Sequence, residues 1–359
     1  MIGRGAIIIF LLGFTFTEAR VDFNHSKIYD EFDFKGQSTV TIDGLCRDTC
    51  HIYASITQES KALAANLLIQ TAKGFVSVAD VAGRVDPTTN QKLFLEVNNT
   101  ASLAIVNANS QLAAGPLVLY VVNQAGGFFG YAEIYEADGF NRPTTGLISA
   151  LTVMSARPFT LKQAHAEGSI AGAPEGVLAQ MAGFDALGYM SDPCPYLYYL
   201  IYGPFPGFTM EVNGPIVSLQ YDLNQFHFPP GNLSATTGIS NKRQLERAGW
   251  VGSPGFHGCL NKQVYRSSLY DFSTPFYAEI TNDQPENMSI DVVTNSDDDH
   301  PVLLVNQDDQ VIYGISDTSD SSPISFSVNS QNLTINWRSD GTGNTHFMVR
   351  WNSTMIPKS

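Results

Sequence analysis

Three consecutive aspartates, Asp297 to Asp299, are the side chains of this sequence best suited to hold a metal ion. Carboxylate oxygens are hard ligands, and Ca²⁺ requires several of them converging on one point. Neighbouring side chains on an extended chain point to opposite faces, so only Asp297 and Asp299 can converge. A solvated acidic loop accounts for the same run without an ion, and we favour it. We therefore predict no cofactor and keep calcium as the alternative.

Motifs for local catalytic sites are missing from the sequence. It contains no Gly-x-Ser-x-Gly, no His-Glu-x-x-His and no glycine-rich phosphate loop. Its seven histidines are scattered, each among apolar or turn residues. A Ser-His-Asp triad can be assembled from distant segments, so a hydrolase with a non-local site stays open as an alternative. We predict that the chain is not an enzyme and name no catalytic residue.

Aromatic residues crowd the stretch after Cys194, and they are candidates for ligand binding because exposed rings can stack on sugars. Aromatic residues along a strand, here bracketed by Pro204 and Pro206, are more often part of a core and a tight turn. We favour the core. The ligand-binding candidates in this run are Tyr196, Tyr198, Tyr199 and Tyr202.

The first nineteen residues have the pattern of a secretory signal peptide. Arg4 supplies the charge, residues 6–16 the apolar run, and Thr17-Glu18-Ala19 a cleavage site. The apolar run is too short to span a bilayer. We therefore predict a secreted, extracellular protein with no membrane span. The net charge of −14 argues against nucleic acid as a partner.

The four cysteines are even in number, as expected in an oxidising compartment. Three pairings are open. Cys46 and Cys50 are close enough to pair with each other, which would leave Cys194 to pair with Cys259. A redox or zinc role for the first pair is disfavoured because its spacing is not Cys-x-x-Cys and no second ligand pair follows.

Six Asn-x-Ser/Thr sequons follow the signal peptide, and we predict them to be glycosylated on exposed turns and strand edges. They are Asn24, Asn98, Asn232, Asn287, Asn332 and Asn352.

Short apolar runs recur between turn residues from residue 40 to residue 135, a spacing that predicts a β-sandwich. Residues 143–249 are less regular, with strand-like runs and a short helix expected over Pro174 to Leu187. We predict a mainly β fold with two sandwich-like (jelly-roll-like) domains and an irregular middle. The expected units are the signal peptide at 1–19, an N-terminal sandwich at 20–142, a middle segment at 143–249 and a C-terminal sandwich at 250–359.

The segment from Leu333 to Trp351 is expected to close the last domain. Residues 333–338 and 347–351 each alternate apolar with polar side chains, and a loop of Ser, Asp, Gly, Thr and Asn lies between them. The pattern predicts an antiparallel hairpin whose bulky face covers a core.

This closing pattern resembles the end of a CUB domain. A weaker resemblance covers residues 250–352, with Ser253-Pro254-Gly255-Phe256 followed by Cys259 similar to a CUB opening loop. The single cysteine in this region moves the match toward the CUB-like modules of nematode-type secreted proteins. The resemblance implies a C-terminal CUB-like sandwich and places Asp340 where calcium-binding members have a ligand. It also implies a link to intestinal and innate defence.

Taken together, these features predict a secreted glycoprotein that recognises an extracellular protein or glycan without catalysing a reaction. A structural component of an extracellular matrix or surface coat is the alternative from another class. Localisation separates the two, since a recognition protein stays soluble in the extracellular fluid and a matrix component becomes detergent-insoluble.

Overall fold

A computed structural model describes the chain from residue 26 to residue 354, with gaps. The described ranges are 26–98, 100, 102–112, 115–123, 133–143, 150–157, 159–165, 175–182, 199–203, 207–212, 216–221, 231–237, 243–245, 248–252, 276–295, 302–307, 310–315, 324–338 and 346–354.

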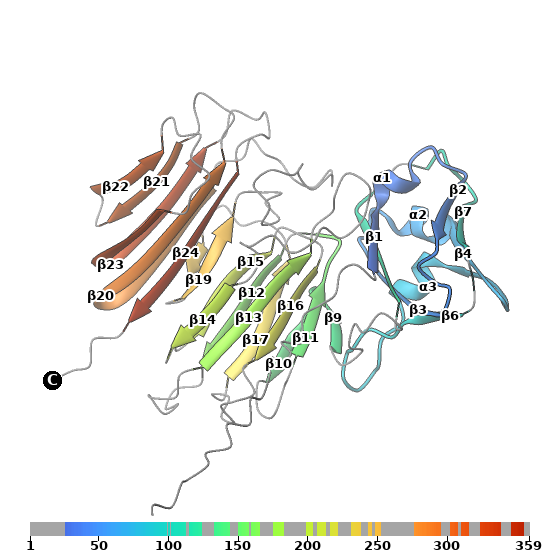
Figure 1. Ribbon diagram of the computed structural model, residues 1–359, viewed down its shortest axis with the longest axis horizontal. Helices are drawn as coiled ribbons and strands as arrows, with labels where there is room; N and C mark the ends of the chain where they lie inside the picture. Colours follow the sequence, from blue (N-terminus) through green and yellow to red (C-terminus); the bar gives the residue numbers. More distant parts are fainter. Residues whose placement is uncertain are drawn as a thin grey trace, which may run out of the picture.

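Two four-stranded sheets form the N-terminal unit, at the right of Figure 1. The first has the order β1 (Ser26–Asp30), β8 (Leu117–Asn123), β3 (Thr49–Ile56) and β6 (Leu95–Asn98). The second has the order β2 (Thr39–Asp43), β7 (Ser102–Asn107), β4 (Leu67–Thr71) and β5 (Gly74–Ser77). All pairings in both sheets are antiparallel.

One core joins the two sheets of this unit. Ile52 of β3, Ile105 of β7 and Ile69 of β4 are fully buried in it. Three short helices complete the core: α1 (Glu31–Phe34), α2 (Lys61–Asn66) and α3 (Val78–Ala82). Helix α1 begins at a capping box in which Asp30 accepts the backbone N–H of Asp33 and the Asp33 side chain accepts that of Asp30.

The middle of the chain contributes a five-stranded sheet. Its order is β14 (Tyr199–Gly203), β13 (Glu175–Ala182), β16 (Ile216–Tyr221), β11 (Ala150–Met154) and β9 (Glu133–Glu136). The helix expected over Pro174 to Leu187 is wrong, because β13 occupies most of that range. Antiparallel pairing with β14 on one side and β16 on the other overrides the helical propensity of its Ala, Leu and Met residues.

An eleven-stranded sheet extends from the middle of the chain to its end (Figure 1). Its order is β10 (Asn141–Pro143), β17 (Gly231–Thr237), β12 (Phe159–His165), β15 (Gly207–Val212), β19 (Ala248–Gly252), β24 (His346–Thr354), β20 (Phe276–Asn295), β23 (Ile324–Arg338), β21 (Val302–Gln307) and β22 (Gln310–Ile315), with β18 (Arg243–Leu245) paired to β20. The sheet contains strands from both sides of residue 249, where the sequence analysis placed a domain boundary.

The closing hairpin is corrected by the strand order. Both of its expected strands exist, as parts of β23 and β24, and their alternation is right, since Leu333, Ile335, Val349 and Trp351 are buried. The two strands are not neighbours, however. Strand β20 lies between them and pairs antiparallel with each. The turn residues between them suggested a direct connection, but the long β20 offers both strands a hydrogen-bonding edge.

The fold is therefore mainly β, as predicted, with mostly antiparallel sheets of a β-sandwich type. Of the helices in the described part of the chain, none has the length and apolar character that crossing a bilayer requires.

Candidate functional site

A polar cavity of about 400 Å³ lies where the N-terminal unit meets the two later sheets. It is built from the end of β3 and the turn into α2, the end of β9, the residues after β11, and the end of β17. The residues that line it are Ser55, Ile56, Thr57, Gln58, Lys61, Glu136, Asp138, Ser155, Ala156, Arg157 and Thr237.

The turn on the N-terminal side of the cavity is held by its own side chains. The backbone N–H of Thr57 donates to Ser60 Oγ at 2.9 Å, and Ser60 Oγ donates to the Thr57 carbonyl at 3.1 Å. Gly115 passes close behind this turn, where an added Cβ would lie 2.8 Å from backbone atoms of Glu59 and Ser60. Only glycine permits this approach, so two backbone segments pack directly against each other at the rim of the cavity.

A chain of polar contacts forms the floor of the cavity. Ser55 Oγ donates to Glu136 Oε1 at 2.6 Å and accepts the backbone N–H of Ala156 at 2.8 Å. Lys92 Nζ donates to the other carboxylate oxygen, Glu136 Oε2, at 2.8 Å. The Lys92 side chain is 2% exposed and that of Glu136 is 23% exposed. Both oxygens of the carboxylate are therefore held in place while one side of the group faces the cavity.

An exposed ion pair stands at the rim. One guanidinium nitrogen of Arg157, Nη2, lies 2.8 Å from Oε1 and 2.7 Å from Oε2 of Glu59. The hydrogen bond from its own backbone N–H, followed by those from Thr57 and Arg157, keeps the pKa of Glu59 below its ordinary value. Both side chains are open to water, so the pair adds little stability. Arg157 is also one of the residues that line the cavity.

The residues that line this cavity can form hydrogen bonds and ion pairs with polar groups. It presents hydroxyls, a carboxamide, carboxylates and cationic nitrogens, which together can both donate to and accept from a ligand. The Ser55 hydroxyl is committed to the Glu136 carboxylate. No histidine or cysteine is among the lining residues in the described part of the chain, so those residues supply no Ser–His or Cys–His nucleophile pair.

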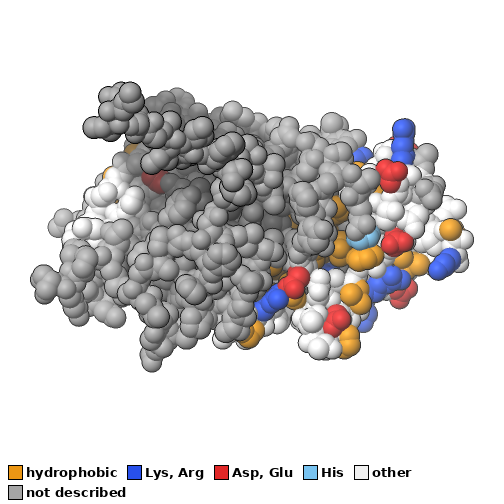
Figure 2. Space-filling model, turned by 60° about the horizontal axis from the view of Figure 1, so that its bottom comes forward, with side chains coloured by type: hydrophobic (Ala, Val, Ile, Leu, Met, Phe, Trp, Pro, Cys, Tyr) orange, Lys and Arg blue, Asp and Glu red, His pale blue; other side chains and the backbone are white. Residues whose placement is uncertain are grey.

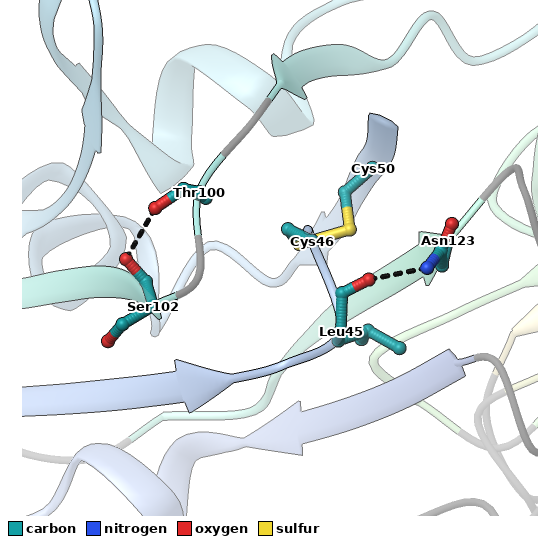
Figure 3. The surroundings of a disulfide bond; sticks show 6 residues. All are labelled: Leu45, Cys46, Cys50, Thr100, Ser102 and Asn123. Carbon is teal, nitrogen blue, oxygen red and sulfur yellow. Dashed lines mark hydrogen bonds between the residues drawn. A yellow bond between two sulfur atoms is a disulfide. The ribbon is translucent and has the colours of Figure 1, made fainter. Parts of the chain in front are cut away.

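The predicted disulfide between Cys46 and Cys50 is present, with a Cα–Cα distance of 5.1 Å. Figure 3 shows it beside Asn123, whose side-chain amide donates to the Leu45 carbonyl at 2.6 Å. The bridge fixes the short loop that leads into β3. Cys194 and Cys259 lie outside the described residues.

The other predicted site residues are distributed over the chain. Asn98, Asn232 and Asn287 are exposed, and Asn332 is half-buried. Asn352 lies in β24, and Tyr199 and Tyr202 lie in β14, in parts of these strands where only the backbone is described. The residues outside the described ranges are Asn24, Tyr196, Tyr198, Asp297, Asp299 and Asp340. Within those ranges, no cluster of three or more His, Cys, Asp or Glu side chains is suited to a metal ion.

The cavity itself was missed by sequence reasoning. Its residues come from four separated segments around positions 55–61, 136–138, 155–157 and 237, and none of these segments carries a motif. Lys92 comes closest to a sequence signal for the cavity, because a buried lysine needs a charged partner. Its burial beside β9 cannot, however, be predicted from the residue type alone.

No family model and no curated protein matches the chain. Among solved structures it is similar to the CUB1-EGF-CUB2 domains of rat MASP-1, with a TM-score of 0.23, 8% identity, and coverage of 62% of this chain and 99% of that chain. A fucolectin from striped bass (Morone saxatilis) serum matches with a TM-score of 0.17 and 10% identity. That match covers 61% of this chain and 87% of the fucolectin. A ruminal GH26 endo-β-1,4-mannanase gives 0.16 and 12%, and the match covers 24% of this chain and only 19% of the mannanase. The first match is a distant CUB-like resemblance, and TM-scores of this size carry no argument about function.

Proposed function

We propose that this chain is a secreted glycoprotein that binds an extracellular polar ligand, without catalysing a reaction, in the cavity beside Glu136. The signal-peptide pattern, the sequons and the Cys46–Cys50 disulfide support the extracellular part of the proposal. The CUB-like pattern of the C-terminal region supports a recognition role, and its resemblance to nematode-type secreted proteins implies that this role is in innate defence.

The observation that carries the binding role is the prebuilt polar floor of the cavity. Its carboxylate is held on both oxygens by Ser55 and Lys92, so a ligand meets a group that is already oriented. A volume of about 400 Å³ falls in the range of small-ligand pockets, which occur preferentially between domains. Because the lining offers donors and acceptors together with apolar surface, the ligand class that fits best is a hydroxyl-rich one with an apolar face, such as a terminal sugar of a glycan.

The test is binding of the secreted full-length chain to an immobilised array of defined oligosaccharides. Two cavity residues are changed, Gln58→Ala and Asp138→Asn, because both are exposed lining residues whose loss should not disturb the fold. Two exposed residues outside the cavity give matched controls, Gln70→Ala in β4 and Asp43→Asn in β2.

We expect selective binding to a subset of sugars that falls at least tenfold in both cavity variants and stays unchanged in both controls. Binding that all four variants retain would place the site elsewhere. A chain that is recovered only in the detergent-insoluble fraction would instead indicate a matrix component.

A further inference from the structure

A row of aromatic side chains crosses the outer face of the first sheet toward its edge. The rings of His51 and Phe94 stack with centroids 3.5 Å apart and an interplanar angle of 10°. Tyr53 meets Phe94 edge-on at 6.0 Å, and it stacks with Tyr120 at 6.2 Å. Burial raises the pKa of Tyr53 to about 12. The row is thus well packed from Tyr120 outward, and Phe94 is its exposed end.

The exposed end of the row coincides with an apolar patch on a strand edge. Phe94 is 38% exposed, Leu93 44% and Val85 40%. Figure 2 shows hydrophobic side chains gathered beside a histidine on this face of the molecule. Strand β6 is the last strand of its sheet, and its outer edge pairs with no strand in the described part of the chain, whereas residues 92–94 just before it are bonded to residues 84–85. An apolar patch beside an unpaired edge invites association with other chains unless something covers it.

Asn98 lies on the same outer face of this strand, four residues beyond Phe94. Leu95 and Val97 point into the core, while Glu96 and Asn98 are exposed. The side-chain nitrogen of Asn98 donates to Glu96 Oε1 at 2.8 Å, so it is directed back along the strand toward Phe94. At the rise of an extended strand, four residues correspond to roughly 13 Å, a span that two linked sugar rings can cover.

We propose that Asn98 carries an N-linked glycan whose first sugars lie along β6 and stack on Phe94. The apolar face of a pyranose ring would cover the exposed ring face, as the opposite face is covered by His51. The glycan would then shield both the apolar patch and the free edge of the sheet. This proposal rests on the secreted-glycoprotein part of the proposed function and not on the ligand cavity: Asn98 lies opposite Thr49 at the start of β3, whereas Ser55 and Ile56 at its end line the cavity.

The modification requires a lipid-linked oligosaccharide diphosphate as donor. The side-chain nitrogen of Asn98 forms a bond to C1 of the first sugar, the bond from C1 to the phosphate oxygen breaks, the lipid diphosphate leaves and the nitrogen loses one proton. The second proton stays on the nitrogen as a hydrogen-bond donor. The acceptor sequence is completed by Thr100, whose Oγ1 donates to the Ser102 carbonyl at 2.6 Å in the turn after β6 (Figure 3).

The test combines occupancy with a double-mutant cycle on the secreted full-length chain. Mass spectrometry of glycopeptides measures occupancy at Asn98. Melting temperatures are then compared for the wild type, Asn98→Gln, Phe94→Leu and the double variant. Asn232→Gln, which removes another exposed sequon, is the control, made both in the wild type and in the Phe94→Leu variant.

We expect Asn98 to be occupied, and loss of its glycan to lower the melting temperature by about 1–3 °C when Phe94 is present and by nothing measurable when it is Leu. Asn232→Gln should have the same effect in both backgrounds. An unoccupied Asn98 in the secreted chain, or an equal loss in both backgrounds, would overturn the proposal.

If the Phe94→Leu variant is not secreted, NMR of the wild-type chain still tests whether the glycan stacks on Phe94. Ring-current shifts of the protons on the first two sugars of the Asn98 glycan support stacking, and unshifted proton signals contradict it.

Discussion

His51 is a titratable side chain that is buried and stacked on an aromatic ring. It is 7% exposed, and its ring stacks on Phe94 with the nearest Glu96 carboxylate oxygen 4.0 Å from Nε2. Burial lowers the pKa of His51, and the Glu96 carboxylate raises it only in part. The folded chain therefore holds fewer protons at this site than the unfolded chain once the pH falls below the ordinary value of 6.5.

The pH dependence of stability follows from that difference. Where the unfolded state binds more protons, stability increases with pH, so this histidine makes the protein less stable as the pH falls from 6.5 toward its lower folded pKa. We expect His51→Phe, which keeps a ring against Phe94, to flatten the melting temperature between pH 7 and pH 5 relative to the wild type. Parallel melting curves across this range for both proteins would contradict the assignment.

At this scale, local spacing was enough to predict some residues and not others. Cys46 and Cys50 are four residues apart, and so short a loop brings them together in almost any fold. Ser55, Glu136 and Lys92 could not be predicted as a group, because their contacts join positions 81 and 44 residues apart. A serine, a glutamate and a lysine in separate strand-like runs look like ordinary surface residues.

The elements were readable wherever one face of a strand is buried. In β6 buried residues alternate with exposed ones and in β7 with exposed or half-buried ones, and both strands fall within the short apolar runs expected from residue 40 to residue 135. Pairing was harder to predict, as β23 and β24 show, because alternation reveals which face is buried and not which strand lies alongside. Strand β13 was missed altogether because its Ala, Leu and Met residues are also good helix formers.

Trp351 tests the arrangement of the last strands. It is 1% exposed, in β24 between β19 and β20, and it is among the largest fully buried side chains described. We expect Trp351→Ala to reduce the free energy of unfolding by about 3–5 kcal/mol, because the cavity left behind cannot be refilled. The control change Ser327→Ala, on the exposed side of β23, should alter the free energy of unfolding by no more than about 0.5 kcal/mol. Chemical denaturation monitored by fluorescence measures both, and a small loss for Trp351→Ala would place that ring on the surface.

The whole molecule is held together by contacts that cross between its units. Glu136 belongs to β9, which pairs in parallel with β11, while Ser55 and Lys92 come from the N-terminal part of the chain. Gln91 also forms an isolated β-bridge to Tyr135, next to the same ion pair. The end of β3 and the segment before β6 are thereby fixed to the five-stranded sheet. Composition and length predicted several units but contained no information on how they join.

The Lys92–Glu136 pair should be the most costly of these contacts to break. Lys92→Met keeps the length of the side chain but leaves the partly buried carboxylate without its cation, and we expect a loss of about 2–4 kcal/mol in the free energy of unfolding. Adding Glu136→Gln should recover part of that loss, since a neutral amide is easier to bury. Lys73→Met, at an exposed turn, is the control and should leave the free energy of unfolding almost unchanged. Equal denaturation midpoints for Lys92→Met and Lys73→Met would show that the pair is only a surface contact.

The parallel contact between β15 and β19 is short in the described part of the large sheet, where only Thr209–Gly249 and Met210–Trp250 are in register. By comparison, the register of β20 with β24 continues from Asn287 to Asn295. Backbone hydrogen bonds resist tension together only when many are loaded at once. Tension across the large sheet would therefore separate β15 from β19 before it separates β20 from β24.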